Sequence, residues 1–344
     1  MTETISFDPN ALALKDSNIF GLPFTPETAK LVFIPVPWEV TVSYNAGTAQ
    51  GPAAIFNASK QVDLFDPDSP DAWKNGYAMA EVPQSLLDKN DKFRGLAEGY
   101  IAFLEDGGNI AENPKMKETL TKIDAACEEM NNWVQQQAAS LLDKGKLVAL
   151  IGGDHSTPLG LMRELAKRYE SFGILHFDAH LDLRDAFEGF KYSHASIMFN
   201  AIELPSLKKL VQIGIRDYCE QEANVVRDSN GRIVAYYDRA LKERLYEGET
   251  WKQLADEMIQ HLPDHVYVSF DIDGLDPKLC PNTGTPVAGG LEAEQALYVV
   301  KQLVRSGRQI IGFDLNEVAP GDDEWDANVA ARLLYRLANL MISA

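Results

Sequence analysis

Short apolar runs rich in β-branched residues alternate with amphipathic segments along most of the chain. The predicted strands are residues 31–37 (LVFIPVP), 146–153 (KLVALIGG), 173–178 (GILHFD), 209–217 (KLVQIGIRD), 266–273 (VYVSFDID) and 309–317 (QIIGFDLNE). Stretches such as VALI, QIGI and IIGF are apolar without alternation, as in strands buried on both faces of a parallel sheet. The pattern therefore predicts a sheet covered by helices on both sides.

Segments with apolar residues every three or four positions separate these strands and predict helices. The longest runs from about Lys117 to Leu142, and others include TPLGLMRELAKRYE and DANVAARLLYRLANLM. Residues 65 to about 115 are rich in Asp, Pro, Asn and Gly and are predicted to be irregular. The β-α repeats predict an α/β fold, a three-layer α-β-α sandwich around a mostly parallel sheet. Because no linker separates two halves, we expect a single domain over residues 1–344.

The composition narrows the classes of partner. The chain of 344 residues has a formal net charge of −19 at pH 7. Such a field repels nucleic acid and anionic membranes and favours cationic ligands, although an acidic surface also serves solubility. The 3 cysteines include no CxxC pair, and no apolar run is long enough to span a membrane. The N-terminal MTETISFDPNALAL lacks a basic segment followed by an apolar one, so we expect a cytoplasmic protein.

Metal-binding residue types collect at the carboxyl ends of four predicted strands. The motifs are IGGDHS (151–156), DAHLD (178–182), SFDIDGLDP (269–277) and FDLNEVAP (313–320). In an open parallel sheet these ends line one edge, where the ligand crevice forms. Each motif alone is compatible with a helix cap or a solvated turn. Together they supply two imidazoles and four carboxylates: His155, Asp178, His180, Asp182, Asp271 and Asp273.

This donor set predicts a centre of two divalent metal ions. Four carboxylates packed together repel one another and take up protons, whereas two cations that share bridging carboxylates remove the conflict. Oxygen-rich ligation without sulfur favours Mn²⁺, with Ni²⁺, Co²⁺ and Fe²⁺ as alternatives. Two such ions lower the pKa of a shared water toward neutrality, so the expected reaction is hydrolysis.

The motifs GGDHS, DAHLD and SFDIDGLDP, in this order, resemble the signatures of the ureohydrolases, the family of arginase, agmatinase, guanidinobutyrase and formiminoglutamase. The likeness extends through GTPVAGG (284–290) and DLNEVAP. It implies an arginase-like domain with an eight-stranded parallel sheet, assembled as a homo-oligomer, either a trimer or a hexamer. Residues 1–30 would then be an N-terminal extension and residues 65 to about 115 an insertion.

The resemblance also implies how the ligands divide between the two ions. Asp178 and Asp271 would bridge them, with His155 and Asp182 on one ion and His180 and Asp273 on the other. Asp182 would, in addition, accept a hydrogen bond from the attacking water.

Further residues receive roles from the same resemblance. His194, in YSHAS, would shuttle protons or position the substrate, with a capping or buried structural role as the alternative. Glu317 would pair with the guanidinium of the substrate, and a planar cation with several N–H donors does need a fixed carboxylate. Thr285 and Asp276 are expected to support the ligands. His176 is expected to face away from the metal ligands as a buried supporting or core residue.

The expected substrate is a small cationic guanidino compound. The loop LRDAFEGFKYS (183–193) lacks the Asn-rich and Ser/Thr-rich character with which arginases hold an α-carboxylate, and it places Arg184 near the mouth of the site. Cys219 stands where arginases tend to carry an acidic amine-binding residue, for which Glu220 or Glu222 can substitute. Because YNAGTAQGPAAIF (44–56) is similar to agmatinase-like members, agmatine is the expected substrate.

The sequence alone is compatible with other substrates and with other classes of protein. Arg184 or Lys191 would suit the carboxylate of guanidinobutyrate or formiminoglutamate, and guanidine or arginine are further alternatives within the family. A metal-binding relative without turnover would lack a ligand or Glu317, and neither is missing. A deacetylase-like metallohydrolase would lack GGDHS and the Glu317 motif.

Overall fold

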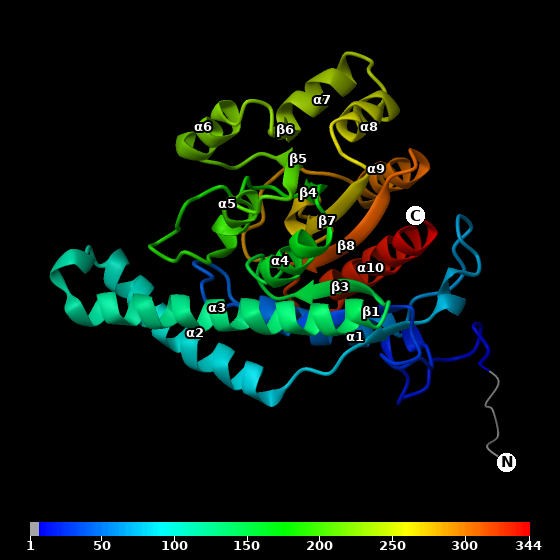
Figure 1. Cartoon of the computed structure of the whole chain (residues 1–344), viewed down its shortest axis with the longest axis horizontal. Coiled ribbons are helices and arrows are strands. Elements are labelled where there is room, and N and C mark those ends of the chain that lie inside the picture. The colour runs from blue at the N-terminus through cyan, green and yellow to red at the C-terminus, as the bar shows by residue number, and fades with distance from the viewer. Residues whose placement is uncertain (1–6) are drawn as a thin grey trace.

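The computed structural model describes residues 7–344, whose strands form one eight-stranded sheet (Figure 1). The strands are β1 (Leu31–Val36), β2 (Tyr77–Met79), β3 (Leu147–Gly152), β4 (Phe172–Phe177), β5 (Leu207–Ile215), β6 (Ile233–Tyr237), β7 (His265–Asp271) and β8 (Gln309–Asn316). Their order is β2-β1-β3-β8-β7-β4-β5-β6, and every neighbouring pair is parallel. The predicted α/β fold with an eight-stranded parallel sheet is confirmed.

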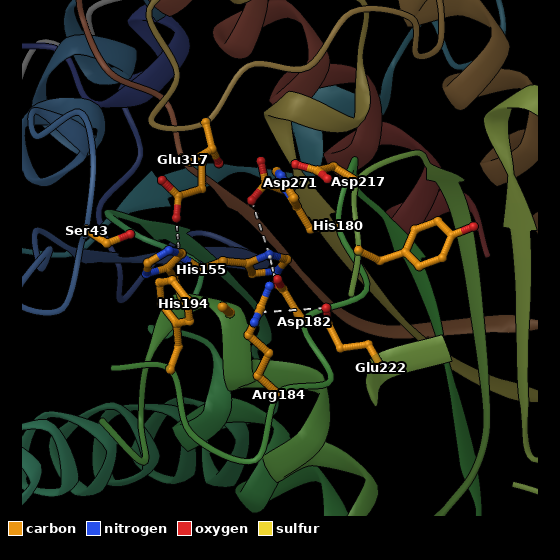
Figure 2. A pocket seen from close by; sticks show the side chains of 14 residues that line it. Ser43, His155, His180, Asp182, Arg184, His194, Asp217, Glu222, Asp271 and Glu317 are labelled. Carbon is orange, nitrogen blue, oxygen red and sulfur yellow. Dashed lines mark hydrogen bonds and ion pairs between the residues drawn. The ribbon is translucent and has the colours of Figure 1, made fainter. Parts of the chain in front are cut away.

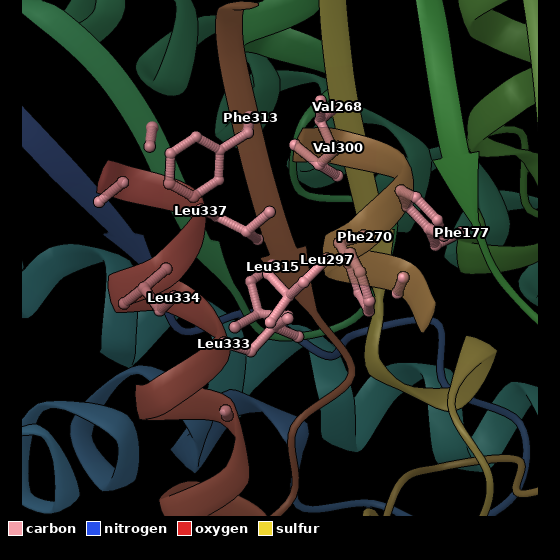
Figure 3. Close-up of a cluster of buried hydrophobic side chains, with 14 of the residues drawn as sticks. Phe177, Val268, Phe270, Leu297, Val300, Phe313, Leu315, Leu333, Leu334 and Leu337 are labelled. Carbon is pink, nitrogen blue, oxygen red and sulfur yellow. The ribbon is translucent and has the colours of Figure 1, made fainter. Parts of the chain in front are cut away.

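Two apolar layers enclose the sheet, because successive residues of a strand point to opposite faces. In β1, Leu31 and Phe33 belong to one buried cluster, whereas Ile34 and Val36 belong to the other. The first cluster includes α1 (Gly51–Ser59), α8 (Trp251–Gln260), α9 (Ala293–Arg305) and α10 (Trp325–Ser343). The second includes α2 (Gln84–Glu105), α3 (Pro114–Asp143), α4 (Leu159–Arg168) and α5 (Ile197–Ile202). Figure 3 shows part of the first cluster, where side chains of α9 and α10 meet those of β7 and β8.

The prediction that residues 65 to about 115 are irregular was wrong. This region contains β2 and the 22-residue helix α2, and α3 begins at Pro114 rather than near Lys117. Helix α2 lies along α3 (Figure 1) and buries Leu86, Ala97 and Tyr100. Helix α2 packs on one side only, against α3 and the second apolar cluster, so its apolar residues form a narrow stripe. The rest of its surface is polar, and this polar composition concealed the helix in the sequence. The less regular stretch after β5 likewise contains α6 (Glu220–Asp228), β6 and α7 (Asp238–Tyr246).

The start of the expected N-terminal extension, residues 1–6, lies outside the described residues. Farther along, Ile19, Phe20 and Leu22 are buried in the first apolar cluster, so this part of the chain is anchored to the body. Across residues 7–344, no helix has both the length and the apolarity that a membrane crossing requires.

Candidate metal centre and active site

Four neighbouring strands in the middle of the sheet carry the predicted ligands and Glu317, which follows β8. The strands β3, β8, β7 and β4 lie side by side, although the chain forms them in the order β3, β4, β7, β8. Because parallel strands end at the same edge, residues that are far apart in sequence meet there. The ligands stand after β3 (His155), after β4 (Asp178, His180, Asp182), and at and just after the end of β7 (Asp271, Asp273).

The imidazoles and carboxylates of this group face one another. Nδ1 of His155 lies 3.1 Å from Oδ2 of Asp178 and 3.3 Å from Oδ2 of both Asp182 and Asp271. Nδ1 of His180 lies 3.3 Å from Oδ1 of Asp178 and 3.1 Å from Oδ2 of Asp273. Asp178 therefore presents one carboxylate oxygen to each imidazole, as a ligand shared by two ions would.

The charges of this group fit a pair of cations. Burial and the neighbouring carboxylate of Asp178 raise the pKa of Asp182 to about 7. Burial, Asp273 and Asp178 together raise the pKa of Asp271 well above its usual range. Divalent ions remove this repulsion, and two adjoining sets of candidate ligand atoms share Asp178. The residues present therefore fit a binuclear metal site.

Two residues of the site adopt left-handed backbone conformations. The φ angle is 54° at Asp182 and 62° at Glu317, a region in which residues other than glycine need support from their surroundings. The N–H of Glu317 donates to the carbonyl oxygen of Gly153 at 2.8 Å, and the hydroxyl of Thr283 donates to the carbonyl oxygen of Glu317 at 2.8 Å. A Cβ at Gly153 would overlap the carbonyl oxygen of Trp38, which explains the glycine in the GGDHS turn.

A cavity of about 130 Å³ opens over this group (Figure 2). Its walls include His155, His180, Asp182, Asp271, His194 and Glu317, whereas Asp178 and Asp273 are buried beneath them. The carboxylate of Glu317 is 5% exposed, and its Oε1 accepts a hydrogen bond from the backbone N–H of His155 at 2.8 Å. One oxygen of Glu317 is thus fixed while the side chain faces the cavity.

His194 lines the same cavity from the first residue of a short 3-10 turn (His194–Ser196). The edge of its ring meets Phe187, with ring centroids 6.1 Å apart. Burial, with His180 and His155 nearby, lowers the pKa of His194 to about 4. The imidazole is therefore neutral near pH 7.

Arg184 and Glu222 line the cavity near its mouth, but Cys219 does not. Nε of Arg184 lies 3.7 Å from Oε2 of Glu222, and its guanidinium lies 4.9 Å from the centre of the Phe187 ring. Glu222 accepts backbone hydrogen bonds from Leu183 at 3.1 Å and from Cys219 at 3.0 Å. It therefore ties the start of α6 to the DAHLD loop as well as facing the cavity.

The residues expected to support the ligands differ in position. Oγ1 of Thr285 lies 3.4 Å from Oδ2 of Asp273. Asp276 accepts a hydrogen bond from the backbone of Lys278 and does not line the cavity. The expectation that His176 faces away from the ligands was wrong, because residues two apart on a strand share a face. Nε2 of this buried histidine lies 2.9 Å from Oδ2 of Asp178.

Sequence reasoning missed several residues of the cavity and its surroundings. Ser43, Phe187 and Tyr218 line the cavity, but their loops carry no recognisable ligand pattern. Behind the site, Nε2 of His155 lies 2.9 Å from Oγ of Ser269, which donates to Oδ1 of Asp314 at 3.0 Å. Ser269 was detectable in principle, because it is a polar residue two positions before Asp271 in an otherwise apolar strand.

Comparison with known proteins shows the family of the chain. The family model described as "Arginase family" matches residues 29–339. Over 94% of each chain, the protein is 29% identical to N(1)-aminopropylagmatine ureohydrolase of Thermus thermophilus. It is 32% identical to agmatinase of Edwardsiella ictaluri over 95% of each chain, and 32% identical to guanidinobutyrase of Pseudomonas aeruginosa over 93% of this chain and 91% of that protein.

Comparison of the fold with solved structures agrees with the comparison of sequences. The crystal structure of agmatine ureohydrolase of Thermoplasma volcanium superposes with a TM-score of 0.70 at 22% identity, over 93% of this chain and 92% of that one. The motifs, the metal-ligand group at the sheet edge and these matches agree. The chain belongs to the arginase family and is a ureohydrolase with a His/Asp metal-site cluster.

Proposed function

We propose that the chain hydrolyses a small linear guanidino compound to urea and an amine, and that it is agmatinase-like. The observation that carries this proposal is the Glu317 carboxylate in the same cavity as the ligand group, fixed by its hydrogen bond to His155. A guanidinium seated there presents N–H donors to a carboxylate while its carbon faces the metal ligands. The relatives are named for aminopropylagmatine, agmatine and guanidinobutyrate, all of them guanidino compounds.

Two Mn²⁺ ions are the proposed cofactors. Asp178 and Asp271 would bridge them, His155 and Asp182 would complete one site, and His180 and Asp273 the other. When bound, such a pair supplies a water whose pKa is lowered toward neutrality. The oxygen-rich donor set supports Mn²⁺, with Ni²⁺, Co²⁺ and Fe²⁺ as alternatives.

The side chains around the metal ligands bind and orient the reactants. Glu317 accepts hydrogen bonds from the guanidinium and holds its carbon toward the metal ligands. Asp182, which is 5% exposed, accepts a hydrogen bond from the attacking water. His194, which is neutral near pH 7, would take the proton that the attacking water loses and pass it to the departing amine.

Agmatine is the proposed substrate because an unpaired carboxylate stands at the mouth of the cavity. Asp217 is exposed, lines the cavity and forms no ion pair with any of residues 7–344, so it is free to receive a distal ammonium group. The cavity is also smaller than the roughly 300–1,000 Å³ of drug-sized ligand sites, which suits a short chain. Guanidinobutyrate is the second candidate, since Arg184 places a guanidinium near the same mouth, where a carboxylate could meet it.

The test is urea release from agmatine, guanidinobutyrate, arginine and guanidine with Mn²⁺ or Ni²⁺, with formamide release from formiminoglutamate measured in parallel. We expect the highest kcat/KM with agmatine and expect Asp217→Asn to lower that value without changing metal content. Aminopropylagmatine belongs in the same panel. Full activity after complete removal of metal by a chelator would end the proposal.

Two architectural proposals rest on the family resemblance. We propose that residues 1–344 form one arginase-like domain and that it assembles as a trimer or hexamer. Light scattering on the purified chain measures the assembly, and a monomeric mass would contradict it.

A further inference from the structure

A buried pair of side chains stands directly behind the carboxylate proposed to bridge the two ions. His176 of β4 and Gln212 of β5 are register partners on neighbouring strands. Both side chains are 0% exposed, and neither lines the cavity. Nε2 of His176 lies 2.9 Å from Oδ2 of Asp178, and Nδ1 of His176 lies 3.0 Å from Nε2 of Gln212.

The orientation of the Gln212 amide is set by a backbone carbonyl. Nε2 of Gln212 lies 2.7 Å from the carbonyl oxygen of Leu181, in the DAHLD loop. A carbonyl oxygen can only accept a hydrogen bond, so the atom facing it must be the NH₂ group. The flipped amide would place two oxygens in contact, which removes the usual ambiguity of glutamine side chains.

The amide orientation in turn fixes the tautomer of His176. The second N–H of Gln212 points to Nδ1 of His176, which must accept it and therefore carries no proton. The proton of the neutral imidazole then resides on Nε2, the atom 2.9 Å from Oδ2 of Asp178. His176 consequently donates a hydrogen bond to this carboxylate.

The tautomer matters because His176 is placed well enough to be a metal ligand. Its ring nitrogen lies in one set with ligand atoms of His155, Asp178 and Asp182, all within 4.8 Å of one another. With its proton on Nε2, the lone pair needed for coordination is absent. With the proton on Nδ1, Nε2 would carry a free lone pair beside these ligand atoms and would compete with the carboxylates for a metal ion.

We infer that Gln212 and His176 form a positioning pair that orients the Asp178 carboxylate and keeps His176 from coordinating metal. This inference rests on the proposed function only in taking Asp178 as the shared ligand. Hydrogen-bonded partners of metal ligands typically change metal affinity or activity by about 10- to 100-fold when they are removed. We expect an effect of that size on Mn²⁺ affinity.

The first experiment reads the tautomer directly. The chain has only 6 histidines, so their rings can be resolved in long-range ¹H–¹⁵N correlation spectra of ¹⁵N-histidine-labelled protein. The set of signals that disappears in the His176→Gln variant belongs to the ring of His176. Spectra are recorded on metal-free protein and on protein loaded with diamagnetic Zn²⁺. We expect a protonated Nε2 in both states. In Gln212→Glu, the new carboxylate accepts from Nδ1, and the proton moves there. A protonated Nδ1 in the unsubstituted protein would overturn the inference.

The second experiment measures the metal centre without turnover. Mn²⁺ titration by calorimetry, together with the electron paramagnetic resonance signal of the coupled ion pair, is compared for His176→Phe, His176→Gln and Gln212→Glu. We expect His176→Phe and Gln212→Glu to weaken Mn²⁺ binding about 10- to 100-fold, and His176→Gln, which keeps an N–H donor, to recover most of it. His261→Gln, a histidine outside the cavity, is the matched control.

The outcomes separate the two proposals. Two Mn²⁺ ions bound with unchanged affinity in His176→Phe would refute the positioning role, whatever the activity. If the unsubstituted protein binds two ions and shows the expected tautomer but releases no urea from any guanidino compound, only the proposed function fails. If His176→Phe does not fold, the tautomer in the unsubstituted protein and in Gln212→Glu decides the question.

Discussion

Replacing Glu317 by Gln tests the central residue of the proposed substrate site with almost no change in shape. In the unsubstituted protein the His155 N–H donates to Glu317 at 2.8 Å, and the Gln oxygen can still accept this hydrogen bond. The turn after β8 should therefore persist. The second oxygen becomes an NH₂ group, which opposes the N–H groups of a guanidinium. The variant therefore removes the charge and one acceptor while it keeps the volume.

The expected size of the effect follows from the bonds that are lost. Hydrogen bonds to charged groups contribute about 1.5–3 kcal/mol, and 1.4 kcal/mol corresponds to a tenfold change. We therefore expect kcat/KM for agmatine to fall roughly 10- to 150-fold. Thermal stability should not fall, because burial and the nearby carboxylates already raise the pKa of Glu317 well above its usual range, so its charge is costly in the folded protein.

The assay is urea release at substrate concentrations well below KM, with metal content measured on the same samples. Metal content is the necessary control, since Glu317 also touches the turn that carries His155. A kcat/KM within threefold of the unsubstituted protein, at two metal ions per chain, would refute the role of Glu317. A fall in activity that tracks metal loss would instead assign Glu317 to the metal site.

Three further predictions concern charge, packing and specificity. Because the pKa values of Asp154 and Asp182 are about 7 in the folded protein and near 3.8 when unfolded, metal-free protein loses stability as pH rises from 6 to 8. The melting-temperature gap between Mn²⁺-loaded and chelated protein should therefore widen over that range, and a constant gap would contradict this. A Cβ added by Gly99→Ala in α2 would have no atom within 4 Å. The free energy of unfolding measured in urea should therefore rise by about 0.5–1 kcal/mol. Gly153→Ala should destabilise by about 1–3 kcal/mol through overlap with backbone. Arg184→Gln should raise kcat/KM for agmatine relative to guanidinobutyrate, because it removes a cation that repels an ammonium and pairs with a carboxylate, and a lowered ratio would contradict this role of Arg184.

The hydrophobic pattern was sufficient to predict six of the eight strands, all except β2 and β6, and the positions of the motifs at their carboxyl ends. Strands buried on both faces are continuous apolar runs, and polar residues at their carboxyl ends therefore stand out, as Asp178 and Asp271 do. The rules for parallel sheets then predict that these ends meet at one edge. Helix α2 escaped prediction because its buried residues, such as Ala97 and Tyr100, form a narrow stripe in a polar segment.

Contacts between distant residues could not be derived in this way. The tautomer of His176 depends on Gln212, 36 positions later, and on the carbonyl of Leu181, so no local pattern encodes it. The side chains proposed to set the substrate specificity are equally non-local, because Arg184 and Asp217 follow different strands and line the same cavity only in the folded chain. Strand ends predict where ligands gather, but the shape of the cavity arises from loops whose conformations the periodicity does not specify.

The local charge of the site explains the preference for a guanidinium better than the net charge of the chain does. The proposed metal ligands and Glu317 contribute five carboxylates, each at most 5% exposed: Asp178, Asp182, Asp271, Asp273 and Glu317. A sixth buried carboxylate of the cavity wall, Glu222, lies 3.7 Å from Nε of Arg184, which offsets its charge. Two divalent cations bound as proposed would leave one of these five negative charges uncompensated, and the attacking hydroxide would add another. A guanidinium brings a single delocalised positive charge together with N–H donors to this cavity, whereas a neutral amide or ester brings no positive charge. The net charge of −19 only raises the concentration of cations near the surface. The excess of buried carboxylates over metal charge is therefore the proposed reason why the site selects a guanidinium substrate.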